Sequence, residues 1–219
     1  MEQRQAAPDL DPAGLQAYRL LERRIVTLDL APGSLTTEGA LILSTGLGRT
    51  PVREAIQRLA WEGFLEVRPR AGLTVAPLHP SDWLRVVDAR RGVEAVLAAS
   101  AARFVTQARA DALSAAADAM QEAVGRRDVL GFLAADKAMD EAVAAAADNR
   151  FAAMLAAPLQ THSRRFWFRF QSDGGLEEAA ARHLGMLEAI LSRDGEKAAA
   201  AADGLMGMLR AHAEAAALG

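Results

Sequence analysis

The apolar residues of the N-terminal third recur at steps of three and four, which is typical of one face of a helix. Between residues 12 and 28 these positions are Leu15, Tyr18, Leu21, Ile25 and Leu28. The Pro-Gly pair in "APGS", residues 31–34, favours a turn. A short second helix is predicted over residues 37–44, and Gly46 is expected to end it in the left-handed conformation.

A third helix is predicted within "GLGRTPVREAIQRLAWEGFL", residues 46–65. Thr50 is a candidate N-cap, and Pro51 suits the first helical position because its missing N–H has no intrahelical partner there. The apolar stripe of this helix is expected to face the core and comprises Val52, Ala55, Ile56, Leu59 and Ala60.

The period changes to two after Gly63. In "FLEVRPRAGLTVAPL", Leu65 and Val67 alternate with polar residues, and the alternation resumes after Pro69–Gly72. This pattern predicts a two-stranded hairpin. Its tip is basic, because it carries Arg68 and Arg70.

The remainder of the chain has no strand pattern. Helix breaks near residues 106, 127–128, 148–150, 174–175 and 194–195 leave about six helices of roughly 15 to 25 residues. Alanine is abundant, which permits close approach of helices and favours a compact bundle. The predicted fold is therefore mostly α: a winged helix-turn-helix within residues 1–78, followed by an all-α bundle within 79–219.

Composition excludes several classes of protein. The chain has 219 residues and no cysteine, which removes disulfides, thiolate metal sites and cysteine nucleophiles. No apolar run approaches the roughly 20 residues of a membrane span, and the polar start "MEQRQAAPDLDPAG" is unlike a signal or transit peptide. We expect a soluble, cytoplasmic protein with no membrane partner.

The net charge of −3 conceals a local basic patch. All of the net negative charge lies after residue 80, whereas the window 46–72 holds five arginines against three glutamates. On the third helix Arg49, Arg53 and Gln57 recur at steps of four, opposite the apolar stripe. Arginine can read guanine in the major groove, while Thr50 and backbone N–H groups can hold phosphate. With the basic hairpin tip, this order of elements favours binding of double-stranded DNA over a merely solvated surface helix.

The segment "LAPGSLTTEGALILSTGLGRTPVREAIQRLAWEGFLEVRPRAGLTVA" resembles the DNA-binding domain of GntR-type bacterial transcription regulators. The resemblance implies that four residues approach DNA: Arg49, Thr50, Arg53 and Gly72. The chain departs from the family at Gly48, where Ser or Thr is usual, and at Gly39, where some members carry a basic phosphate contact. These departures concern operator preference rather than DNA binding.

The segment "VVDARRGVEAVLAASAAR" and the helices after it are similar to the FCD ligand-sensing domain of the FadR-like subgroup. Many such domains hold a metal with one Asp and three His, and the metal helps to hold a small carboxylate. Asp136 and His183 match two of these positions, whereas Asp140 and Leu205 stand where histidines are expected. The resemblance, with Asp136 and Asp140 one turn apart, suggests a divalent ion such as zinc, nickel or manganese. The alternative is a hydrated polar pocket in which the acids pair with arginine.

Candidate effector-binding residues lie in two places. Arg90 either forms an i, i+4 pair with Glu94 or faces an effector pocket. In "HSRRFWFRF", Arg164 and Arg165 can neutralise an anionic ligand beside Trp167, although an aromatic stripe is more often core. An anionic, carboxylate-bearing effector is expected.

The interpretation that unites these features is a homodimeric transcription repressor with a palindromic operator and an effector-binding bundle. Alternatives are a regulator with a metal-free pocket and one whose bundle only dimerises. A metal-dependent hydrolase using Asp136, Asp140 and His183 is more remote, because no nucleophile, general base or phosphate loop accompanies these residues.

Overall fold

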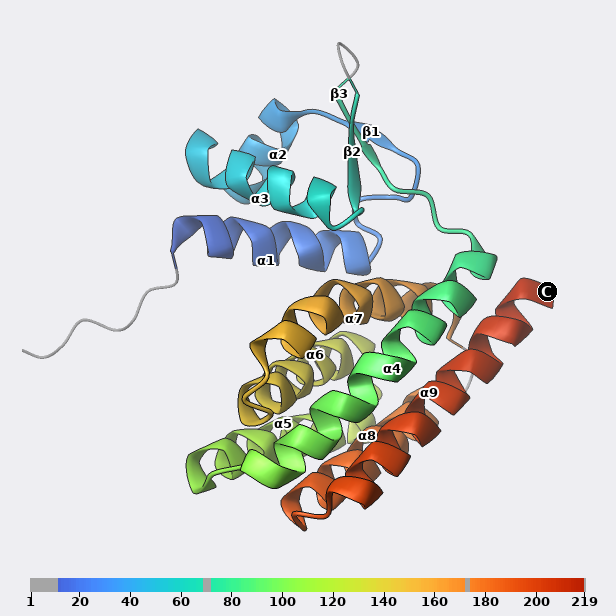
Figure 1. Ribbon diagram of the computed structural model, residues 1–219. Coiled ribbons are helices and arrows are strands. Elements are labelled where there is room, and N and C mark those ends of the chain that lie inside the picture. The colour runs from blue at the N-terminus through green and yellow to red at the C-terminus, as the bar shows by residue number, and fades with distance from the viewer. Residues whose placement is uncertain (1–11, 69–71, 172–173, 219) are drawn as a thin grey trace, which may run out of the picture. The chain divides into compact units, whose positions relative to one another are not determined.

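The computed structural model describes residues 12–68, 72–171 and 174–218. The chain divides into two compact units, the first ending at Pro77 and the second beginning at Leu78. Figure 1 shows helices and a small sheet in the first unit and a bundle of helices in the second. Each unit is described by itself.

The first unit combines three helices with a small antiparallel sheet. Its elements are α1 (Ala13–Val26), β1 (Leu35–Thr36), α2 (Glu38–Thr45), α3 (Arg49–Trp61), β2 (Leu65–Arg68) and β3 (Gly72–Val75). The described part of this sheet has three strands in the order β1-β3-β2, so the prediction of a two-stranded hairpin was incomplete. The strand β1 was missed because two residues are too few for an alternating pattern.

The core of the first unit is built from the apolar stripes predicted from the sequence. Val52, Ala55, Ile56 and Leu59 are buried, whereas Ala60 is half-buried. The same cluster includes Tyr18, Leu21, Ile25, Leu41, Phe64, Leu65, Leu73 and Val75. The apolar stripe of α3 therefore faces α1 and the sheet, which directs the opposite face of α3 outward.

Turn chemistry fixes where α2 and α3 begin and end. Gly46 ends α2 with a φ of 69°, which confirms the predicted left-handed cap. The N-cap of α3 is Gly48 rather than Thr50, so that prediction was wrong. Thr50 lies within the first turn of α3, and its exposed side chain does not cap the helix.

The wing depends on a close approach between β1 and β3. Gly72 has a φ of 94°, and a Cβ at this position would lie 2.7 Å from the carbonyl oxygen of Thr36. Only glycine fits this position without strain. Val67 is 63% exposed, because only the Leu65 end of β2 covers the core. Arg70 lies outside the described residues.

The second unit is all-α in the described residues. Its helices are α4 (Pro80–Phe104), α5 (Gln107–Gly125), α6 (Val129–Ala146), α7 (Arg150–Phe170), α8 (Gly175–Leu191) and α9 (Gly195–Leu218). Helix α4 packs along α9 and α7, and α5 packs on α6 (Figure 1). Trp83 of α4 stacks on Phe166 of α7, with ring centroids 6.0 Å apart. This central packing brings α4, α6, α7, α8 and α9 around one buried polar site.

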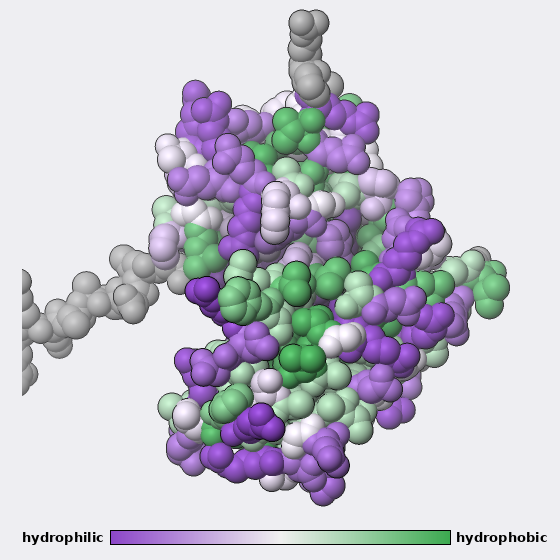
Figure 2. Space-filling model, in the orientation of Figure 1, coloured by the Kyte–Doolittle hydropathy of each residue, from purple (hydrophilic) through white to green (hydrophobic). Residues whose placement is uncertain are grey.

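The surface of the bundle mixes polar and apolar side chains, and Figure 2 shows apolar ones gathered on its visible face. On α7, Phe151, Met154 and Leu155 are each about two-thirds exposed. None of the described helices is both long and apolar enough to cross a bilayer.

Candidate DNA-binding surface and ligand site

The outward face of α3 carries the predicted DNA-binding residues. Arg49, Arg53 and Gln57 are exposed at steps of four, and Thr50 is exposed beside Arg49. A helix with four polar side chains on its free face and a buried apolar stripe on the other has the form needed to enter a major groove.

A carboxylate of α2 holds Arg53. Its Nε donates to both carboxylate oxygens of Glu38, at 2.8 and 2.9 Å, and the two side chains are 59% and 36% exposed. Glu38 is fixed in turn by its place at the start of α2, directly after the N-cap Thr37. Because Glu38 uses only Nε, the four donors on the terminal nitrogens of Arg53 remain for other acceptors.

The wing contributes a further exposed cation, Arg68. The Nη2 of Arg68 lies 3.2 Å from a carboxylate oxygen of Glu66, and both side chains are more than half exposed. Such an exposed pair contributes little to stability, so Arg68 can exchange Glu66 for another anion at small cost.

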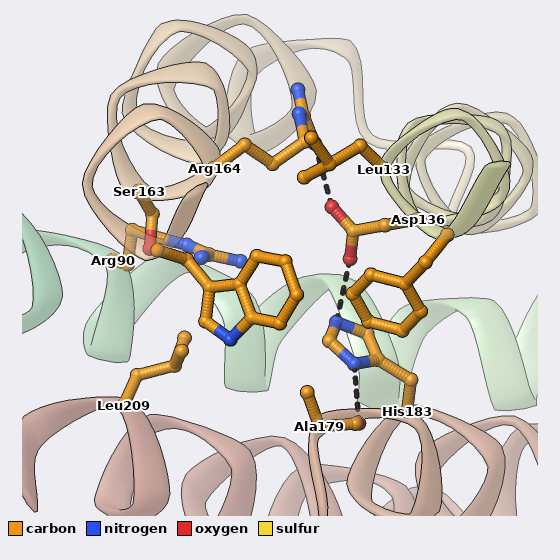
Figure 3. Close-up of a pocket in the computed structure, with 10 residues that line it drawn as sticks. Arg90, Leu133, Asp136, Ser163, Arg164, Ala179, His183 and Leu209 are labelled. Carbon is orange, nitrogen blue, oxygen red and sulfur yellow. Dashed lines mark hydrogen bonds and ion pairs between the residues drawn. The ribbon is translucent and has the colours of Figure 1, made fainter. Parts of the chain in front are cut away.

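A buried ion cluster joins three helices of the bundle (Figure 3). Nη1 of Arg164 on α7 lies 2.5 Å from Asp140 Oδ2 and 3.2 Å from Asp136 Oδ2, both on α6. Nη2 of the same guanidinium donates to Thr161 Oγ1 at 3.0 Å. Nε2 of His183 on α8 lies 2.7 Å from the other oxygen of Asp136. The structure thus brings together Asp136, Asp140 and His183, with Arg164 between the two acids.

A second buried pair lies next to this cluster. Arg90 and Glu94 on α4 are each 4% exposed and form an ion pair at 2.8 Å. Gln160 of α7 donates to the same Glu94 oxygen at 3.1 Å. Arg90 also lines the cavity described below, so the predicted i, i+4 pair is present and an effector role for Arg90 stays a prediction.

Burial and charge set the protonation of the cluster. Burial alone raises the pKa of Asp136, but His183 and Arg164 outweigh it and hold the pKa below its ordinary value. The pKa of Asp140 is raised to about 7, by burial and by the neighbouring carboxylate of Asp136, against the attraction of Arg164. For His183 burial lowers the pKa, and Asp136 reverses this to a net rise. Asp136 and His183 therefore each favour the charged form of the other, and Asp140 is the acid that takes up a proton most readily.

A small cavity adjoins the cluster. Its lining residues are Arg90, Phe132, Leu133, Asp136, Ser163, Arg164, Trp167, Ala179, His183 and Leu209. The cavity volume is about 20 Å³, enough for about one water molecule. Nε1 of Trp167 is buried in this wall and has no hydrogen-bond partner among the described residues. An indole N–H donates only, so it offers a place for an acceptor atom of a ligand.

Not every predicted effector residue lines this cavity. Arg90, Arg164 and Trp167 do, whereas Arg165 is absent from the lining. Arg165 is 1% exposed, and burial lowers its pKa to about 10.

The donor set does not fit a divalent ion. The oxygens of Asp136 and Asp140 that converge are already bridged by Arg164, and Nε2 of His183 faces Asp136. Among the described residues no group of three His, Cys, Asp or Glu is arranged to hold a metal. Instead, Asp136 and Asp140 both pair with Arg164.

Sequence reasoning missed several partners of these side chains. Glu38 precedes Arg53 by fifteen positions and belongs to another helix, so no local spacing connected them. Thr161 precedes Arg164 by three positions on α7, so its helical spacing was a usable signal, whereas Gln160 contacts Glu94 of another helix and offered none.

With this geometry established, comparison with known proteins identifies the class. Residues 13–75 match the gntR family of bacterial regulatory proteins, and residues 85–214 match the FCD domain. The chain therefore belongs to the GntR family of transcription regulators with an FCD effector-binding domain. The family and the curated relatives are transcription regulators and not enzymes, which excludes the hydrolase interpretation.

Particular relatives agree with this assignment. The HTH-type transcriptional repressor RspR of Escherichia coli K12 is 27% identical over 186 residues, covering 84% of this chain and 82% of that protein. The repressor GlaR of the same organism is 26% identical over 198 residues, covering 84% and 88%. The solved structure of E. coli McbR/YncC has a TM-score of 0.80 at 19% identity, covering 94% of this chain and 99% of that one. The last likeness supports the fold.

Proposed function

We propose that the protein is a homodimeric, cytoplasmic transcription repressor whose operator affinity changes when a small molecule binds in the FCD bundle. Residues 1–78 are the proposed DNA-binding domain, and residues 79–219 the proposed effector-binding and dimerisation domain. The exposed row of Arg49, Arg53 and Gln57 on α3 carries the DNA-binding assignment. The names of the relatives RspR and GlaR favour repression.

The proposed DNA contacts divide into base and phosphate contacts. Arg49, Arg53 and Gln57 read base edges in the major groove, where a good bidentate contact discriminates by about 1–3 kcal/mol. Thr50 and the backbone at Gly72 lie against phosphate. Arg68 and Arg70 of the wing add contacts whose strength falls with salt.

Arg53→Ala tests the recognition helix. Loss of one bidentate contact should weaken specific operator binding by about 5- to 150-fold in a gel-shift titration. Arg126→Ala, which removes an exposed cation at the end of α5, is the matched control and should leave operator affinity unchanged. Unchanged melting of both variants would show that the loss is not caused by unfolding. Operator affinity retained by Arg53→Ala would contradict the assignment.

A palindromic operator requires two recognition helices, which a symmetric homodimer supplies about 34–36 Å apart. The exposed apolar residues Phe151, Met154 and Leu155 of α7 support association, because burial of such side chains is favourable. Sedimentation analysis at micromolar concentration should find a dimer. A monomer that still binds a full palindrome with one-to-one stoichiometry would contradict this part of the proposal.

The proposed effector site is the cavity beside Arg90, Arg164 and Trp167. A cavity that holds one water must open to admit a larger molecule, and opening it separates side chains of α4, α6, α7, α8 and α9. An effector that binds the open arrangement better than the closed one shifts the bundle between them. We favour a carboxylate-bearing effector, because Arg90 and Arg164 can exchange an internal carboxylate for that of the ligand.

Thermal stabilisation tests the effector class, because a ligand that binds only the folded state raises its melting temperature. The probes are acetate, succinate and benzoate, each paired with its uncharged amide. A carboxylate should stabilise the wild type more than its amide does. Trp167→Phe keeps an aromatic ring but removes the N–H, so it should weaken this response. If no carboxylate exceeds its amide, the anionic effector is refuted.

A further inference from the structure

The buried acids of α6 require a cation in the folded protein. Asp136 and Asp140 are one helical turn apart and each 6% exposed, so their carboxylates would repel in a poorly solvated interior. Nη1 of Arg164 lies within 3.2 Å of an oxygen of both. A guanidinium remains charged at any ordinary pH, so it meets this need permanently.

A divalent ion and Arg164 would compete for the same oxygens. A metal ligated by both carboxylates must lie about 2.0–2.2 Å from an oxygen of each. Nη1 of Arg164 already lies within 3.2 Å of an oxygen of each acid, and Figure 3 shows its contact with Asp136. The two cations therefore exclude one another at this point.

His183 retains the orientation of a metal ligand. Nδ1 lies 2.8 Å from the carbonyl oxygen of Ala179, and because a carbonyl only accepts, Nδ1 carries the proton. Metal-bound histidines are commonly held by such an N–H bond to a backbone carbonyl. Nε2 then points to Asp136 at 2.7 Å. His183 and Arg164 therefore contact different oxygens of Asp136, and only Arg164 lies between the two acids.

We propose that the guanidinium of Arg164 is the resident cation of this site in place of a divalent metal, and that removing it uncovers a latent metal site made by Asp136, Asp140 and His183. Ligand binding in the adjoining cavity then needs no metal. This last consequence rests on the proposed effector function, whereas the identity of the cation does not.

The test compares wild type, Arg164→Ala and a matched control, Arg169→Ala, which removes an exposed arginine from the same helix. Each protein is treated with chelator, dialysed, and titrated with Zn²⁺, Ni²⁺ and Mn²⁺. Bound metal is measured by elemental analysis and stability by thermal melting. Wild type and Arg169→Ala should bind less than a tenth of an ion per chain. Arg164→Ala should bind close to one ion per chain, with a melting temperature that rises by several degrees with metal concentration.

Additional variants separate the site from adventitious binding. Arg164→Lys keeps the cation and should gain no metal, and Arg164→Ala combined with His183→Ala should lose what Arg164→Ala gained. If Arg164→Ala is unfolded without metal, refolding in the presence of any of the three ions supports the proposal, and failure with all three overturns it. One ion per chain in the wild type, lost in His183→Ala, also overturns it. None of these readouts depends on DNA or effector binding, so failure of the proposed function leaves the result interpretable.

Discussion

Glu38→Ala is the most informative single change in the first unit, because Glu38 holds the proposed base-reading Arg53. Removing this carboxylate should have opposite effects on two kinds of DNA binding. Specific binding should weaken, because the guanidinium of Arg53 loses its fixed orientation. Non-specific binding should strengthen, because one negative charge is removed from a surface that faces phosphates.

The magnitude follows from the exposure of the pair. Arg53 and Glu38 are 59% and 36% exposed, and exposed ion pairs contribute about 0–1 kcal/mol, so the melting temperature should change little. Ordering a flexible side chain on binding costs about 0.5–1.5 kcal/mol. Glu38 already orders the side chain of Arg53 before DNA binds. Loss of Glu38 should therefore reduce the ratio of specific to non-specific affinity by about two- to tenfold.

The assay is a fluorescence-anisotropy titration against an operator duplex and a scrambled duplex at several salt concentrations. Glu54→Ala is the matched control, because it removes an exposed carboxylate from α3. The control should raise both affinities by similar factors and preserve their ratio. If Glu38→Ala also preserves the ratio, then Glu38 does not orient Arg53 for base reading, and the reasoning fails.

Other changes test the wing, the core and the acid cluster. Gly72→Ala should destabilise the first unit by at least about 1–3 kcal/mol in chemical denaturation, and Gly33→Ala by less, because Gly33 has a positive φ but open space around it. Leu59→Ala should cost about 2–5 kcal/mol by the same measurement, because this side chain is fully buried, whereas Leu43→Ala, at an 85% exposed position, should cost little. The raised pKa of Asp140, about 7 against 3.8, means that the folded state binds this proton more tightly than the unfolded state does. The free energy of unfolding should therefore fall as pH rises from 4 to 7, and urea denaturation should show a shallower fall in Asp140→Asn.

Helices were predictable because their apolar residues repeat with the helical period. The core stripe from Val52 to Leu59 and the cap at Gly46 follow from residue types within a few positions of each other. Strand β1 was not predictable, because it has two residues and exists only through its antiparallel pairing with β3 about 38 positions away. The start of α3 was misplaced by Thr50, a strong N-cap type that lies inside the helix here because Gly48 already has the extended conformation of the cap.

The sequence predicted that Asp136, Asp140 and His183 lie together, but not which cation the two acids bind. Asp136 and Asp140 face the same point because they are four residues apart on one helix, and the family resemblance brought His183 to them. Spacing does not reveal which cation fills that point, because Arg164 belongs to another helix and lies 24 and 28 positions from the acids. The family resemblance suggested a metal because Asp136 and His183 match metal-ligand positions of the family. It did not indicate that Arg164 contacts both acids.

The buried charges also bear on whether the bundle senses a ligand or only dimerises. Replacing a buried ion pair by apolar residues of similar volume is often neutral or stabilising by about 1–4 kcal/mol. A bundle needed only for association would therefore have no evident need of buried charges at Asp136, Asp140, Arg164, Arg90 and Glu94. These charges instead join α4, α6 and α7 beside a cavity whose wall holds an unsatisfied indole N–H. A ligand that takes one of these partners must alter the contacts between helices, which is the property that an effector site requires and a dimerisation scaffold does not.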